Sequence, residues 1–108
     1  GECMNDPQMK TVATALAALG HEARLSVYRL LVRAGHDGLK VGEIAEQLDL
    51  PASTLAHHLR ALVQAGLVVQ EKLGREVISR PDFDAMTRTL AFLSDECCVG
   101  VSARADVA

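Results

Sequence analysis

The stretch from Pro51 to Val68 constrains the fold of this 108-residue chain more than any other. Its apolar residues recur at i, i+4, i+7 and i+8, the spacing of one buried stripe on an amphipathic helix. These residues are Leu55, Leu59, Leu62 and Val63. Gly66 follows the last of them, and glycine commonly ends a helix. We therefore predict a helix from Pro51 to Gly66.

A second stripe of the same helix is polar and contains no acidic residue. It consists of Ser53, His57, Arg60 and Gln64, at i, i+4, i+7 and i+11. Hydroxyl, imidazole, guanidinium and amide groups are the ones that bond to the base edges and phosphates of DNA. Any surface helix can carry a polar face, so the stripe becomes informative only together with its neighbours.

The neighbouring segments predict a winged helix-turn-helix. Upstream, Val41–Leu50 predicts a short helix that a tight connection joins to the polar-striped helix. Downstream, strands are expected at Leu67–Leu73 and Arg75–Arg80, with a turn at Gly74. A helix-turn-helix followed by a hairpin is a winged helix, which is a mainly α fold with a small β-hairpin. The polar stripe then predicts a DNA recognition helix.

Length and composition predict one domain in a reducing compartment. A chain of 108 residues is enough for a single modest core. Three cysteines are an odd number, which argues against a disulfide framework and favours the cytoplasm. No apolar run is long enough to cross a bilayer, and the polar start at Gly1–Met4 does not resemble a secretory signal. We expect a flexible arm at 1–8, the domain at 9–96 and a cysteine-bearing tail at 97–108.

The net charge of −3 is distributed unevenly. From Leu50 to Arg80 four bases face two acids, a local balance of +2. From Pro81 onward five acids face two bases, a balance of −3. The acidic groups are thus concentrated away from the predicted DNA face. The modest positive charge predicts modest affinity for each protomer, so we expect a dimer to be needed.

The remaining helices predict how such a dimer forms. Helices are expected at 9–19 and 22–34, and a last helix follows Pro81 with Asp82 as its N-cap. Phe83, Met86, Leu90 and Leu93 recur along it at i, i+3, i+7 and i+10, and the series next reaches Cys97. A seam of this kind indicates pairing with another helix. We expect the partner to be the same helix of a second chain, giving a homodimer.

Cys97 and Cys98 are adjacent and therefore poor disulfide partners, because consecutive Cα atoms lie about 3.8 Å apart and bridged ones about 4.4–6.8 Å. They are better suited to binding one soft ion together as thiolates. A three-sulfur site would need Cys3, from the same chain or its partner. The alternative is that both are incidental thiols of a tail.

With these pieces in place, the chain resembles the ArsR/SmtB family of dimeric winged-helix repressors over about 9–98. Four segments carry the resemblance: Leu19–Leu25 (LGHEARL), Val41–Ala45 (VGEIA), Ser53–Leu59 (STLAHHL) and Ala65–Val68 (AGLV). The third is similar to the family's S-x-V-S-x-H-L recognition signature. It departs from it at Ala56, where the family usually has serine, and Lys40 stands where a helix-capping Ser or Thr is common.

The resemblance implies binding of operator DNA that a metal or metalloid reverses. The C-x-C of well-known arsenical repressors, in the first helix of the helix-turn-helix, is absent here. The last helix also lacks the histidines that zinc- and cobalt-responsive members use. Cys97 and Cys98 look like the thiols that arsenite-responsive members carry at the end of that helix. Either Cys3 completes such a site, or the effector needs only two sulfurs, as a monomethylated trivalent arsenical would.

The sequence thus predicts a cytoplasmic, homodimeric repressor of double-stranded operator DNA, with no membrane partner. It is expected to be released by As(III), as arsenite or methylarsenite, with Sb(III) as a substitute, and to hold no permanent cofactor. The predicted DNA contacts are Ser53, Thr54, His57, His58, Arg60, Gln64, Lys72 and Arg75. The predicted effector ligands are Cys97, Cys98 and Cys3.

Two alternatives keep the winged helix and change its role. A thiol redox or persulfide sensor would use a disulfide between Cys3 and Cys97 or Cys98. An adaptor would bind protein and show no salt-dependent affinity for DNA. We do not expect an enzyme, since no Gly-rich phosphate loop, nucleophile–base pair or carboxylate dyad is recognisable.

Overall fold

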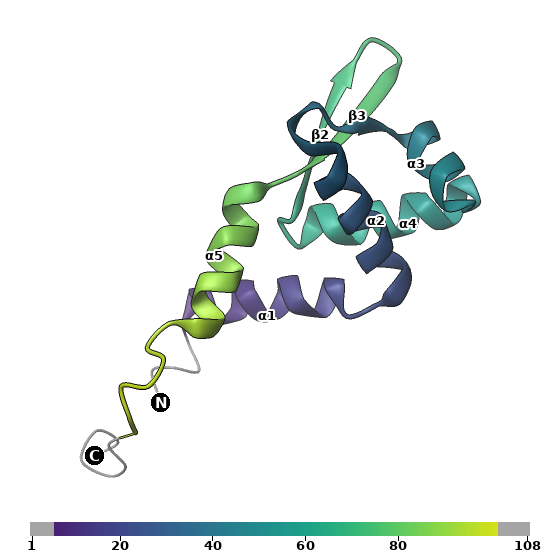
Figure 1. Cartoon of the computed structure of the whole chain (residues 1–108). Helices are drawn as coiled ribbons and strands as arrows, with labels where there is room; N and C mark the ends of the chain where they lie inside the picture. Colours follow the sequence, from purple (N-terminus) through teal and green to yellow (C-terminus); the bar gives the residue numbers. More distant parts are fainter. Residues whose placement is uncertain (1–5, 102–108) are drawn as a thin grey trace.

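The computed structural model describes residues 6–101 and is mainly helical, with one small antiparallel sheet (Figure 1). In chain order its elements are α1 (Pro7–Leu19), α2 (Glu22–Ala34), the 3-10 turn η2 (Gly35–Asp37), β1 (Leu39–Lys40), α3 (Val41–Leu48), α4 (Ala52–Gln64), β2 (Val68–Leu73), β3 (Glu76–Pro81) and α5 (Phe83–Ser94). The predicted fold class, a winged helix-turn-helix with few strands, is confirmed. Within residues 6–101, no helix combines the length and apolarity needed to span a membrane.

Short polar side chains determine where the first and last helices begin. The carboxylate of Asp6 accepts a hydrogen bond from the backbone N–H of Gln8 at 2.8 Å, and Pro7 occupies the first helical position. The carboxylate of Asp82 likewise accepts from the N–H of Ala85 at 3.0 Å, as predicted. Helix α1 therefore starts two residues before the expected domain boundary, and Pro7 and Gln8 do not belong to an arm.

The core lies where α2, α3 and α4 meet the base of the sheet. Its largest fully buried apolar side chains are Val27, Leu31, Ile44, Leu55, Leu62, Leu67 and Val68. Three of the four residues in the predicted apolar stripe of α4 are buried. The fourth, Val63, is 36% exposed, because at 3.6 residues per turn it lies about 80° around the helix from Leu55.

The sheet has the strand order β1-β3-β2, and the hairpin of β2 and β3 forms the wing (Figure 1). Strand β1 was not predicted; its two residues pair with Ser79 and Ile78 of β3. Gly38 makes this pairing possible, since it has φ +70° and a Cβ there would lie 2.6 Å from the carbonyl oxygen of Ser79. The sheet thereby joins the wing to the start of α3.

Helices α1 and α5 contact each other at the end of the molecule opposite the wing (Figure 1). On α5, Leu90 and Leu93 are 58% and 57% exposed. Met86 packs against the core, whereas these two leucines do not. The second half of the predicted seam, Leu90 and Leu93, therefore lies on the outside of the described chain.

Candidate nucleic-acid interface and thiol pair

Helix α4 presents an exposed polar face that carries no acid. Its members are Ser53, Thr54, His57, Arg60 and Gln64, all of them exposed. The face is available because Leu55, Leu59 and Leu62 fix the opposite side of the helix in the core. Donors and acceptors held on a rigid helix in this way can bond to base edges and phosphates.

His58 does not belong to that face, and the expectation that it contacts DNA is wrong. Its side chain is only 5% exposed, and its ring centroid lies 5.0 Å from that of His21. The position lies about 60° around the helix from Leu55, which is on the edge of the buried stripe. Burial, followed by the nearby His21, Arg24 and His57, lowers the pKa of His58.

His21 and Arg24 connect the start of α2 to its surroundings, and the sequence analysis gave them no role. Nδ1 of His21 accepts a hydrogen bond from the N–H of Ala23 at 3.2 Å and so caps α2. The guanidinium of Arg24 donates to the carbonyl of Ala18 on α1 at 3.4 Å. The sequence signal for this cap is the position of His21, which lies between the helix-ending Gly20 and the next helix, where an N-cap residue stands.

The wing carries Lys72 and Arg75 near its tip, and both are exposed. The two acids of the hairpin are engaged elsewhere: Glu71 pairs with Arg80 and Glu76 with Lys40, each at 3.0 Å. Among residues 6–101, neither Lys72 nor Arg75 forms an ion pair. Their positive charges are therefore not neutralised by a described acid, and their contact with phosphates stays a prediction.

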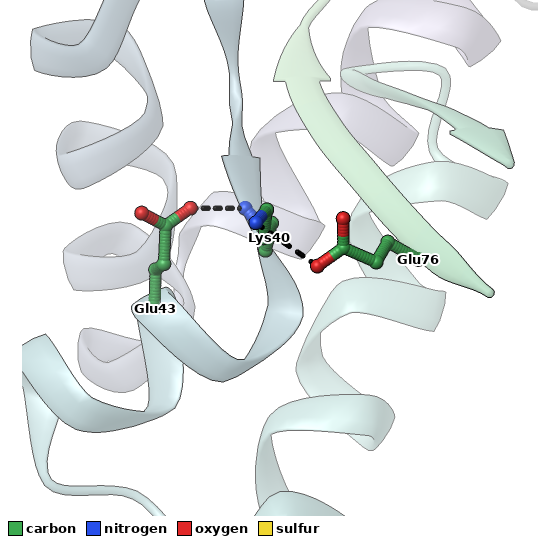
Figure 2. Close-up of polar contacts among 3 residues, drawn as sticks. All are labelled: Lys40, Glu43 and Glu76. Atoms are coloured by element: carbon green, nitrogen blue, oxygen red, sulfur yellow. Dashed lines mark hydrogen bonds and ion pairs between the residues drawn. The ribbon is translucent and has the colours of Figure 1, made fainter. Parts of the chain in front are cut away.

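Lys40 joins the wing to the helix-turn-helix (Figure 2). Its Nζ lies 3.0 Å from a carboxylate oxygen of Glu76, and this bond raises the pKa of Lys40. Its backbone N–H donates to the carboxylate of Glu43 at 2.8 Å. Glu43, at the third position of α3, thus satisfies the backbone N–H of the N-cap residue Lys40, as the glutamate of a capping box does.

The thiols of Cys97 and Cys98 lie together, but not on α5. The helix ends at Ser94, and the N–H of Cys97 donates to the carbonyl of Ser94 in the turn that follows. The expectation that the seam continues to Cys97 is therefore wrong. Asp95 and Glu96 come directly after the helix, where the negative end of the helix dipole disfavours acids.

The two Sγ atoms are 2.8 Å apart and both side chains are exposed. The hydrogen bond between the thiols, more than burial, raises the pKa of Cys97. Cys3, the predicted third ligand, lies outside the described residues. Between residues 6 and 101 no three His, Cys, Asp or Glu side chains are grouped so as to hold a metal ion. The turn by itself therefore offers two sulfur donors.

Comparison with known proteins places the chain among regulators. A model described as a helix-turn-helix domain matches residues 19–71. A Halobacterium salinarum protein named after the arsenical resistance operon repressor ArsR is 36% identical over 69 residues, which are 64% of this chain and 53% of the relative. The chain therefore spans about half the length of that relative. The uncharacterised HTH-type regulator YceK of Bacillus subtilis is 32% identical over 71 residues, covering 66% of this chain and 68% of YceK.

A solved structure gives the same assignment at the level of the fold. It is the homodimeric winged helix-turn-helix DNA-binding domain of a possible ArsR-family regulator from Mycobacterium bovis. The two chains share a TM-score of 0.66 and 26% identity, with 83% of each chain covered. These relatives are transcriptional regulators, which confirms the expectation that the chain is not an enzyme. The chain belongs to the ArsR family of winged helix-turn-helix transcriptional regulators.

Proposed function

We propose that this regulator is a homodimeric repressor that binds double-stranded operator DNA and releases it when a trivalent arsenical binds Cys97 and Cys98. The acid-free, exposed face of α4 carries the DNA part of the proposal. Ser53, Thr54, His57, Arg60 and Gln64 would enter the major groove, and Lys72 and Arg75 would hold flanking phosphates. His58 has no place in this set because it is buried.

The dimer part is supported by the outer surface of α5. Leu90 and Leu93 are exposed there, and Met9 and Leu16 are exposed on the neighbouring helix α1. The Mycobacterium bovis relative is homodimeric. A two-fold dimer would place its recognition helices about 34–36 Å apart, one turn of DNA, on an imperfect palindrome.

The effector part is supported by the chemistry of the thiol pair. Soft sulfur donors prefer soft ions, and the two Sγ atoms are 2.8 Å apart and exposed. Two thiols displace two hydroxyl groups of a trivalent arsenical as water, so two S–As bonds form without a change of oxidation state. Two sulfurs suffice for methylarsenite, while arsenite or Sb(III) would take Cys3 as a third ligand. The arsenical name of the Halobacterium relative agrees with this class of effector.

The thiols can influence DNA binding because their turn is continuous with α5. The backbone of Cys97 bonds to Ser94, the last residue of that helix. A ligand that closes the turn would shift the end of α5, tilt one protomer against the other and change the spacing of the recognition helices. The coupling required is typically about 1–3 kcal/mol. Identical dimer geometry with and without arsenical would exclude this tilt.

A redox or persulfide sensor of the same fold is the second candidate, favoured by the exposure of both thiols. Either protein would act in the cytoplasm, where thiols remain reduced. The two candidates differ in the reagent that releases DNA.

The experiment is fluorescence anisotropy on a palindromic fragment from upstream of the protein's own gene. Arsenite and then methylarsenite are titrated under reducing conditions, against wild type, Cys97→Ser/Cys98→Ser and Cys3→Ser. We expect an arsenical to release wild type while the double variant stays bound to DNA. If Cys3→Ser no longer responds to arsenite but still responds to methylarsenite, Cys3 is the third ligand. Release only by peroxide or persulfide would overturn the arsenical proposal in favour of the redox sensor.

A further inference from the structure

His58 is a buried titratable group that the proposed function does not use. It lies on the inner side of α4 with 5% of its surface exposed. Its Nδ1 atom is buried and has no hydrogen-bond partner among residues 6–101. A neutral imidazole tolerates such a site better than an imidazolium, because burial without a partner penalises charge most.

The groups that face His58 are all bases. His21 approaches from the start of α2 with its ring centroid 5.0 Å away, and His57 lies 5.6 Å away on α4 itself. Arg24 of α2 also acts on it, and the Nε atom of Arg24 is buried with no hydrogen-bond partner in the part of the chain that the structure describes. Helices α1 and α3 and strand β2 also pack on α4, but none of their described charged side chains acts on His58. Within the described part of the chain, no carboxylate is therefore among the groups that would neutralise an imidazolium at this position.

His21 is fixed at the start of α2. Its Nδ1 atom accepts the N–H of Ala23 and so caps that helix. The ring that faces His58 is therefore held at the corner between α1 and α2.

The position of the pair gives it a consequence beyond stability. His21 sits at the corner between α1 and α2, and His58 sits on the helix whose other face is exposed. We infer that the contact between His21 and His58 is an acid-sensitive joint that holds the recognition helix against the α1–α2 corner and loosens when His58 is protonated. The effect on folding follows from the contact itself, whereas the effect on DNA binding rests on the proposed function.

The direction of the pH effect follows from linkage. The folded-state pKa of His58 is lowered, so between the ordinary value of about 6.5 and the lower folded value only the unfolded chain takes up the proton. The contribution of His58 to the free energy of unfolding is therefore fully present above about pH 6.5 and is lost as the pH falls below that value. From about pH 7.5 to about pH 5.5, one such histidine changes the folding equilibrium constant by at most about tenfold.

The test is urea unfolding at these two pH values for wild type, His58→Gln, His21→Asp and His36→Gln. The first variant removes the titrating group. The second keeps an N-cap, because aspartate is a preferred one, and places a carboxylate opposite His58. The third is a control, since His36 is exposed on η2 and its ring contacts Phe83.

We expect wild type and His36→Gln to lose the same stability on acidification and His58→Gln to lose less. His21→Asp should lose least or become more stable, because its carboxylate stabilises the imidazolium. Equal losses in wild type and His21→Asp would overturn the inference, even if His58→Gln failed to fold. Anisotropy with the operator fragment at both pH values then tests the DNA effect. If the protein binds no DNA at about pH 7.5, the proposed function is contradicted. The urea unfolding measurements then test by themselves whether the contact between His21 and His58 is acid-sensitive.

Discussion

Helices α4 and α5 are both amphipathic, but residues 6–101 cover most of the apolar face of α4 and only the first part of that of α5. On α4, Leu55, Leu59 and Leu62 are buried in the core, and the face left outside is polar. On α5, Leu90 and Leu93 remain exposed although their spacing is just as regular. The two helices therefore expose surfaces of opposite character, and each surface fits a different kind of partner. The surface of α4 fits a polar, negatively charged partner such as DNA, and that of α5 fits another apolar helix.

The largest expected effect is on association through α5. In Leu90→Glu/Leu93→Glu, a two-fold dimer would lose four buried leucines, each worth about 1.5–3 kcal/mol. The dimer dissociation constant should rise by more than about a thousandfold in sedimentation velocity, with helical content unchanged. Arg88→Gln is the control, since Arg88 lies about 160° around α5 from Leu90. A double variant that dimerises like wild type would show that α5 does not form the interface.

A smaller effect is expected where α4 enters the core. Leu62→Ala should lower the free energy of unfolding by about 2–5 kcal/mol, because this fully buried side chain leaves a cavity. The adjacent Val63→Ala should cost about 1 kcal/mol or less, because Val63 lies at the exposed edge of the stripe. Urea unfolding measures both. Equal losses would contradict the assignment of the buried face.

Removal of a charge from the wing should weaken DNA binding modestly. Lys72→Ala is expected to reduce the slope of log K against log salt by about 0.9 and to weaken binding similarly for all sequences. Anisotropy at several salt concentrations measures the slope. Lys10→Ala is the control, since it removes one exposed lysine from α1, at the end of the molecule opposite the wing (Figure 1). An unchanged slope for Lys72→Ala would show that the wing does not contact the phosphates.

The smallest effect is expected at the ion pair that joins the wing to α3. Lys40 and Glu76 are both exposed, so their coupling in a double-mutant cycle should be the smallest of these effects and should fall with salt. Lys40→Ala, Glu76→Gln and their combination supply the cycle from urea unfolding. A coupling that salt leaves unchanged would indicate that the pair acts as a buried one.

The periodicity of the sequence was sufficient to predict both faces of α4, because Leu55, Leu59 and Leu62 repeat at helical spacing. It was less informative at the edges of the stripe. Val63 and His58 lie about 80° and about 60° from Leu55 on opposite sides, so their burial depends on what packs there. His21 covers His58, whereas the described structure leaves Val63 partly exposed. Sequence pattern alone does not show such packing between distant segments.

Two other features depended on information that periodicity does not carry. Strand β1 has two residues and is defined by its pairing with β3, so no alternation could indicate it. The end of α5 was placed too late because the apolar series reaches Cys97, whereas the helix ends at Ser94 before two acids. The closeness of the two thiols follows from their adjacency in the sequence, and the roles of Cys97, Cys98 and Cys3 as effector ligands stay predictions.

The most direct test of the account is whether the polar face of α4 reads DNA. Arg60→Ala and Arg29→Ala each remove one exposed arginine, from α4 and α2 respectively. We expect Arg60→Ala to weaken operator binding by about 1–3 kcal/mol and to relax specificity at one base pair of each half-site, with Arg29→Ala near wild type. Anisotropy with the palindromic fragment and with single-base variants of it measures both. Equal affinities for Arg60→Ala and wild type would contradict the assignment of α4 as the recognition helix.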